Sequence, residues 1–84
     1  MVYTVTIQKQ ALKSLAEIPE PYYSKIKSAI YSLALNPRPY GVKKLKNRSG
    51  YRITVADYWI IYNIYDRILL VEVIAVGHWK DIYD

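Results

Sequence analysis

Three consecutive segments in the second half of the chain have the composition of β-strands, and only short turns separate them. The segments are Tyr51–Val55, Tyr58–Tyr65 and Ile68–Val76, and all three are rich in β-branched and aromatic residues. Strands joined by such short turns pair antiparallel. The third segment has Glu72 as its only charge, which is typical of a strand in the middle of a sheet. The chain is therefore expected to build a sheet from its own C-terminal half.

The first half predicts one more strand and two helices. Residues 2–7 alternate in the manner of a strand. Apolar residues then recur with a helical period over residues 8–18, which Pro19 ends, and again over residues 21–35, where Pro37 stops the helix. The predicted fold is α+β with the order β-α-α-β-β-β, an antiparallel sheet carrying both helices on one face.

Length and composition limit the kinds of site that the chain can hold. Its 84 residues are expected to form one domain, residues 1–84. The chain has no cysteine, one histidine and scattered acids, so we expect no metal site and no cofactor. The N-terminus lacks the apolar core of a signal peptide, and no apolar run is long enough for a membrane helix. We therefore expect a cytoplasmic protein without a membrane partner.

Positive charge is concentrated in the middle of the chain. Residues 38–52 hold six cations and no acid, although the net charge of the whole chain is only +5. Such a cluster suits a polyanion, and nucleic acid is the usual one. A solvated loop that aids solubility, or a site for an acidic protein partner, would have the same composition. Strand alternation with Ile53 in the core places Arg52 on the open face of the sheet, directly after the basic segment.

Four motifs follow one another along the chain: NPRP after the second helix, VKKLK, then GYRITVADYWIIY, and a closing VGHWKDIY. In this order they resemble the motifs of the RelE/ParE superfamily of bacterial toxins. The resemblance implies a microbial ribonuclease-like fold and a toxin of a type II toxin–antitoxin pair. RelE-type members cut mRNA in the ribosomal A site without a metal. An antitoxin wraps the toxin and represses the shared operon with it, so DNA is contacted only indirectly. ParE-type members act on DNA gyrase.

The resemblance also implies roles for individual residues. RNA cleavage without a metal needs a base, an acid and cations that stabilise the transition state. The candidate catalytic residues are Arg52, His78, Lys80 and Tyr83. The candidate RNA-binding residues, which would grip mRNA or rRNA, are Lys43, Lys44, Lys46, Arg48 and Trp59. The chain departs from the RelE pattern where Thr54, Trp59 and Trp79 replace cations.

Each assignment has a structural alternative. Arg52 can be a solvated strand residue, His78 a local hydrogen-bonding residue, and Tyr83 an anchor of the C-terminus. The two tryptophans can serve packing or an antitoxin interface instead of base stacking. The first functional hypothesis is a ribosome-dependent mRNA endoribonuclease. The alternatives are a non-enzymatic, ParE-like inhibitor of gyrase and an attenuated toxin that acts mainly through its antitoxin complex.

Overall fold

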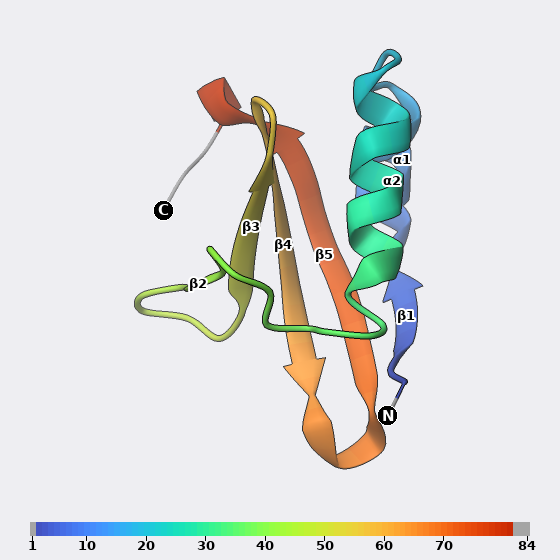
Figure 1. Ribbon diagram of the computed structural model, residues 1–84. Coiled ribbons are helices and arrows are strands. Elements are labelled where there is room, and N and C mark those ends of the chain that lie inside the picture. The colour runs from blue at the N-terminus through green and yellow to red at the C-terminus, as the bar shows by residue number, and fades with distance from the viewer. Residues whose placement is uncertain (1, 82–84) are drawn as a thin grey trace.

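A five-stranded sheet with the order β1-β5-β4-β3-β2 forms the body of the protein (Figure 1). The structure is a computed structural model and describes residues 2–81. Short 3-10 turns at Asp66–Ile68 and Trp79–Asp81 follow the last two long strands. The helices and strands are β1 (Thr4–Ile7), α1 (Lys9–Ala16), α2 (Tyr22–Ser32), β2 (Lys43–Lys44), β3 (Tyr51–Val55), β4 (Tyr58–Tyr65) and β5 (Leu70–His78).

The predicted α+β architecture is confirmed, with one difference in strand direction. Strands β3, β4 and β5 pair antiparallel, and β5 lies inside the sheet between β4 and β1. Strand β1, however, pairs parallel with β5, so the sheet is mixed and not wholly antiparallel. The reason is the connection: β1 is the first strand and β5 the last, and the two helices and three strands between them form a connection long enough for a parallel neighbour. A short extended piece expected near residues 42–45 is present as β2.

Both helices bury their apolar residues against the same face of the sheet. Ala11 and Leu15 of α1 and Ile26 and Ile30 of α2 are almost fully buried there. They form one cluster with inward-facing residues of the three long strands: Ile53, Ile60, Tyr62, Val71, Val73 and Val76. The opposite face, which we call the open face, carries a smaller apolar cluster made of Leu45, Trp59, Ile61, Ile74 and Ala75.

A bulge in β5 decides which residues reach the open face. Ile61 pairs with Ala75 and Tyr62 pairs with Val73, so Ile74 is an extra residue without a counterpart on β4. Such a bulge shifts the alternation of the strand by one residue. Ile74 and Ala75 consequently lie together on the open face, and every later residue of β5 faces the side opposite to the one that unbroken alternation would give it.

Candidate functional site

Two cations lie side by side on the open face, where β2 meets β3. Lys43 is the direct partner of Arg52 in this antiparallel pair, so the two side chains leave the sheet on the same side. Like charges placed opposite each other repel, and an anion bound beside both would offset this repulsion. The two residues line a groove of about 420 Å³ together with Lys44, Leu45, Lys46 and Asn47. The basic loop therefore ends in a place suited to a phosphate group.

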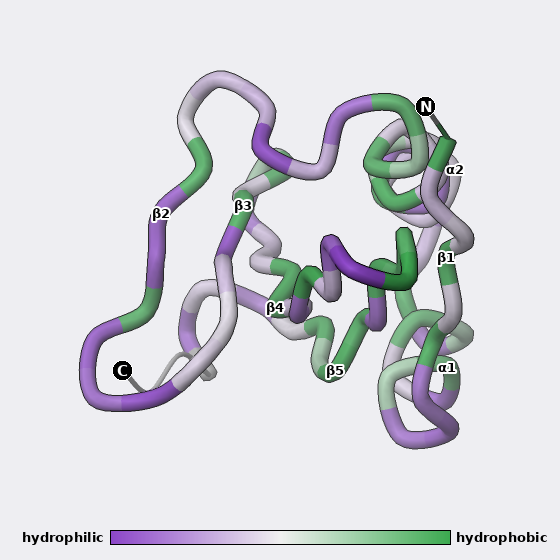
Figure 2. The backbone as a smooth tube through the Cα atoms, turned by 90° about the horizontal axis from the view of Figure 1, so that it is seen from below, coloured by the Kyte–Doolittle hydropathy of each residue, from purple (hydrophilic) through white to green (hydrophobic). Residues whose placement is uncertain are grey.

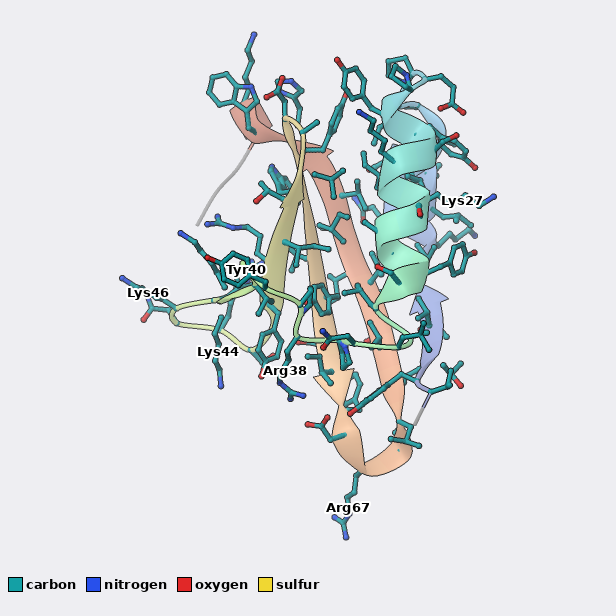
Figure 3. All side chains as sticks on the ribbon, in the orientation of Figure 1. Lys27, Arg38, Tyr40, Lys44, Lys46 and Arg67 are labelled. Carbon is teal, nitrogen blue, oxygen red and sulfur yellow. The ribbon has the colours of Figure 1, made fainter. Side chains whose placement is uncertain are left out.

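Lys44 lies on the other side of the sheet from this pair. Its partner across β2 and β3 is Tyr51, whose ring lies 5.9 Å from the Lys44 ammonium nitrogen. Tyr51 packs with the main core on the helix side. Both of these adjacent lysines, which the sequence predicts as RNA-binding residues, line the groove, but only Lys43 pairs directly with Arg52 on the open face. Lys46 projects from the loop beside them (Figure 3).

Arg38, the first cation of the basic segment, has a structural role that the sequence did not reveal. Its guanidinium donates two hydrogen bonds to the carboxylate of Asp66, at 2.8 and 3.2 Å, and Tyr3 donates a third at 2.6 Å. These contacts, with that of Arg38 the largest, lower the pKa of Asp66 to about 2. Asp66 in turn raises the pKa of Arg38. The two charges lie 28 positions apart in the chain, a separation at which no local pattern can reveal a contact.

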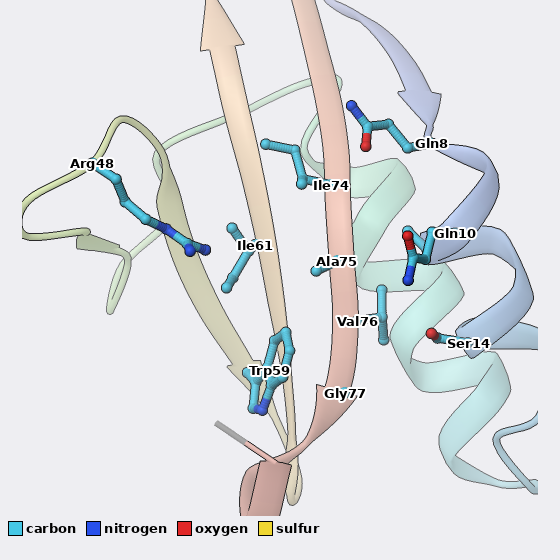
Figure 4. Close-up of a pocket in the computed structure, with 11 residues that line it drawn as sticks. Gln8, Gln10, Ser14, Arg48, Trp59, Ile61, Ile74, Ala75, Val76 and Gly77 are labelled. Atoms are coloured by element: carbon cyan, nitrogen blue, oxygen red, sulfur yellow. The ribbon is translucent and has the colours of Figure 1, made fainter. Parts of the chain in front are cut away.

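A second groove, of about 550 Å³, crosses the open face beyond the paired cations (Figure 4). Its floor is the apolar cluster of Trp59, Ile61 and the two bulge residues of β5. Arg48 extends from the basic loop toward Ile61 at one side of the groove, while Gln8 and Gln10 mark the other side (Figure 4). The open face therefore combines an apolar strip with cations along one border.

Trp59 is a packing residue in this arrangement. Only 5% of it is exposed, and its indole N–H donates a 2.7 Å hydrogen bond to the carbonyl oxygen of His78. The ring lies over Gly77, where an added Cβ would come within 2.5 Å of indole atom Cζ2. The small exposed fraction leaves little of the ring for a base to stack on. Its position supports the packing alternative over the RNA-binding one.

His78 lies on the opposite side of the sheet from Arg52. It pairs with Tyr58, and the two rings meet edge to face with their centroids 5.2 Å apart. Nδ1 of the imidazole accepts a 3.3 Å hydrogen bond from the backbone N–H of Lys80, so the neutral ring carries its proton on Nε2. The bulge at Ile74 causes this placement, because it moves His78 to the helix side. The structure does not bring these two catalytic candidates together.

Of the remaining catalytic candidates, only Lys80 belongs to the described residues. Lys80 lies in the 3-10 turn, with its ammonium nitrogen 5.9 Å from the ring of Trp79. Thr54 is exposed on β3 opposite Trp59, so neither member of this pair supplies a cation. Tyr83 lies outside the described residues.

Residues 2–81 offer neither a metal site nor a membrane-spanning helix. This part of the chain brings together no group of three or more histidine, cysteine, aspartate or glutamate side chains able to hold a metal ion. Neither α1 nor α2 is long and apolar enough to cross a membrane.

Comparisons with known proteins agree with the fold and with the motifs. The family model described as the ParE toxin of the type II toxin–antitoxin system, parDE, matches residues 5–83. RelE1 of Methanocaldococcus jannaschii is 31% identical over 81 residues, which cover 89% of this chain and 90% of that protein.

Solved structures extend the likeness to three dimensions. The archaeal RelE–RelB complex of Pyrococcus horikoshii contains a chain with a TM-score of 0.84 and 25% identity, covering 98% of this chain and all of that one. The RelBE2 toxin–antitoxin complex of Mycobacterium tuberculosis shares the fold, with a TM-score of 0.82 at 21% identity over 93% of this chain and 99% of that one. The resemblance noted in the motifs is confirmed: this chain belongs to the RelE/ParE superfamily, within the family of ParE toxins of type II toxin–antitoxin systems.

Proposed function

We propose that this toxin stops translation in the cytoplasm as a ribosome-dependent mRNA endoribonuclease that needs no metal ion. The observation that carries the proposal is the pairing of Lys43 and Arg52 on the open face. The guanidinium of Arg52 offers a planar fork that matches two phosphate oxygens, and Lys43 adds a point charge beside it. Two fixed cations at one phosphate stabilise the extra negative charge of the transition state for 2′-oxygen attack.

Different parts of the molecule bind the RNA backbone and transfer protons. Lys46 and Arg48 hold the RNA or rRNA backbone beside the paired cations, at the borders of the two grooves. Lys80, in the turn after β5, and Tyr83 remain the candidates for charge stabilisation and proton transfer. His78 faces the helix side, so we assign it to packing that turn.

The same face suits a cognate antitoxin. RelE occurs with RelB in the solved complexes of Pyrococcus horikoshii and Methanococcus jannaschii. We propose that an antitoxin covers the open face with acidic side chains over Lys43 and Arg52 and apolar side chains over the strip around Ile61. Bound in this way it would exclude RNA, and the toxin would meet DNA only through the complex.

Mapping of mRNA 5′ ends shortly after induction without antitoxin tests the nuclease proposal. The wild-type chain should produce new cuts at codon boundaries in translated messages, and Arg52→Ala should abolish them. Arg67→Ala is the matched control, because Arg67 is exposed at the far end of the sheet and points away from the basic loop (Figure 3). Intact messages in wild-type cells would refute the proposal.

A ParE-like inhibitor of gyrase is the second candidate. The match to the ParE toxin model and the neutral pair Thr54–Trp59, where RelE-type chains are expected to carry cations, favour it. Growth arrest with intact messages and induced DNA damage signalling would select this function. Intact messages with unimpaired growth would instead indicate an attenuated toxin that serves mainly to bind its antitoxin.

A further inference from the structure

A row of aromatic rings crosses the end of the sheet from α2 to the last 3-10 turn. Tyr22 lies 5.6 Å from Tyr58, Tyr58 lies 5.2 Å from His78, and His78 lies 5.7 Å from Trp79, measured between ring centroids. The row ends at Trp79, which is 53% exposed, whereas Trp59 beneath it is buried. A large indole left half in water at the end of a packed row is a feature that the fold itself does not require.

The exposed indole is held on a rigid support. The backbone N–H of Trp79 donates a 2.7 Å hydrogen bond to the carbonyl oxygen of Asp57, in the β3–β4 turn. The indole N–H of Trp59 binds the carbonyl of His78 at the same distance, and the close packing of Trp59 on Gly77 fixes the strand just before. Both ends of the His78–Trp79 peptide unit are thus tied to the hairpin. A ring fixed in this way loses little conformational freedom when a flat partner stacks on it.

The position of the indole fits a strand of RNA that also touches the paired cations. Arg52 lies at the level of Ala75 through their common neighbour Ile61. His78, the last residue of β5, follows Ala75 by three residues, so it lies about 10 Å farther along the sheet at roughly 3.3 Å per residue, and Trp79 comes next in the turn. The turn that carries Trp79 swings over the β3–β4 hairpin on the side away from the helices (Figure 1). A few nucleotides of extended single strand can bridge this distance.

We propose that Trp79 is a stacking platform for one unpaired nucleobase of single-stranded RNA, with Lys80 binding the adjacent backbone. The inference rests on the proposed function in taking RNA as the ligand of the open face. Aromatic rings beside cations hold unpaired bases in this way, and stacking tolerates any base. The Lys80 ammonium, 5.9 Å from the indole, supplies the cation. Figure 2 places the basic β2 loop on the side of the molecule away from both helices.

Binding of a short oligonucleotide that cannot be cut tests the platform apart from catalysis. The probe is a labelled hexanucleotide with 2′-O-methyl riboses, which lack the attacking hydroxyl. Trp79→Ala should weaken binding by roughly 5- to 150-fold, the range expected from one stacked base. Tyr31→Ala is the matched control, because Tyr31 is equally exposed, at 52%, but lies on α2. Equal affinity of Trp79→Ala and the wild-type chain would overturn the platform and leave a protein surface as the partner of the indole.

Removing single bases from the probe locates the contact. One abasic position should weaken binding to the wild-type chain and leave binding to Trp79→Ala unchanged. Fluorescence gives a second measurement, because the chain has only two tryptophans and the difference between the emission of the wild-type chain and that of Trp79→Ala isolates the Trp79 signal. The probe should quench this emission, and unchanged emission on binding would overturn the proposal. If binding depends on Trp79 but messages stay intact in cells, the nuclease function fails and the platform stands. If messages are cut but Trp79→Ala binds the probe as tightly as the wild-type chain, the nuclease function stands and the platform fails.

Discussion

The indole of Trp59 lies directly over the backbone of Gly77, its partner across β4 and β5, so closely that no Cβ would fit between them. An aromatic ring often covers a glycine in a neighbouring strand, since the missing side chain leaves space on the sheet surface. Here the pair has a further consequence. The same indole binds the carbonyl oxygen of His78, so the position where a RelE-type cation is expected is occupied by a residue that fixes the end of β5.

Gly77→Ala should destabilise the protein because the new methyl group would meet the Trp59 ring at 2.5 Å. We expect a loss of about 1–3 kcal/mol, which is typical of overpacking. Urea denaturation followed by circular dichroism would measure it. In a Trp59→Val background, where the ring is gone, the same Gly77→Ala change should be much less harmful. An equal loss in both backgrounds would show that the contact is unimportant.

Lys43→Gln should weaken binding of single-stranded RNA far more than Lys44→Gln does. The two residues are neighbours in sequence, but only Lys43 shares the open face with Arg52, while Lys44 lies beside Tyr51. Loss of one phosphate contact should reduce the slope of log affinity against log salt concentration by about 0.7. Titrations of the uncleavable oligonucleotide at several salt concentrations would measure both slopes. Equal effects of the two substitutions would contradict the placement of the site on the open face.

Tyr62→Phe should lower the free energy of unfolding by about 1–3 kcal/mol, the usual effect of leaving a buried acceptor without its donor. The Tyr62 hydroxyl donates a 2.7 Å hydrogen bond to the carbonyl oxygen of Pro37 inside the protein. Burial raises the pKa of this hydroxyl to about 12, so it stays a donor at neutral pH. Tyr65→Phe is the control, because Tyr65 is exposed. Similar losses in the two variants would argue against the buried bond.

Stability should fall in acid as Asp66 becomes protonated. Its pKa is about 2 in the folded protein, against 3.8 for the unperturbed group, chiefly because Arg38 hydrogen-bonds to the carboxylate. A lowered pKa means that the contribution is fully present above about pH 4 and is lost as the pH falls from there toward 2. Denaturation between pH 2 and 5 would give the free energy of unfolding of the wild-type chain and of Asp66→Asn at each pH. The two values should converge at the acid end. A gap that stays constant with pH would contradict this assignment.

Much of the architecture was predictable because it depends on local patterns. The strands at residues 51–55 and 58–65, both helices and the inner position of β5 follow from periodicity, prolines and apolar content, and all are confirmed. The helices end earlier than predicted, at Ala16 and Ser32. The position of Arg52 on the open face was also predictable, because alternation in β3 is unbroken and Ile53 is buried in the core.

The sequence by itself thus determined the elements, the basic segment and the family motifs, because each is a property of neighbouring residues. Only the tertiary structure decided which residues meet. Strand register depends on two strands at once, and the one-residue bulge at Ile74 turns His78 away from Arg52 and sets Gly77 beneath Trp59. Pairing across β2 likewise separates Lys43 from Lys44, and a contact over 28 positions assigns Arg38 to Asp66. Periodicity along a single strand carries no information about such partners.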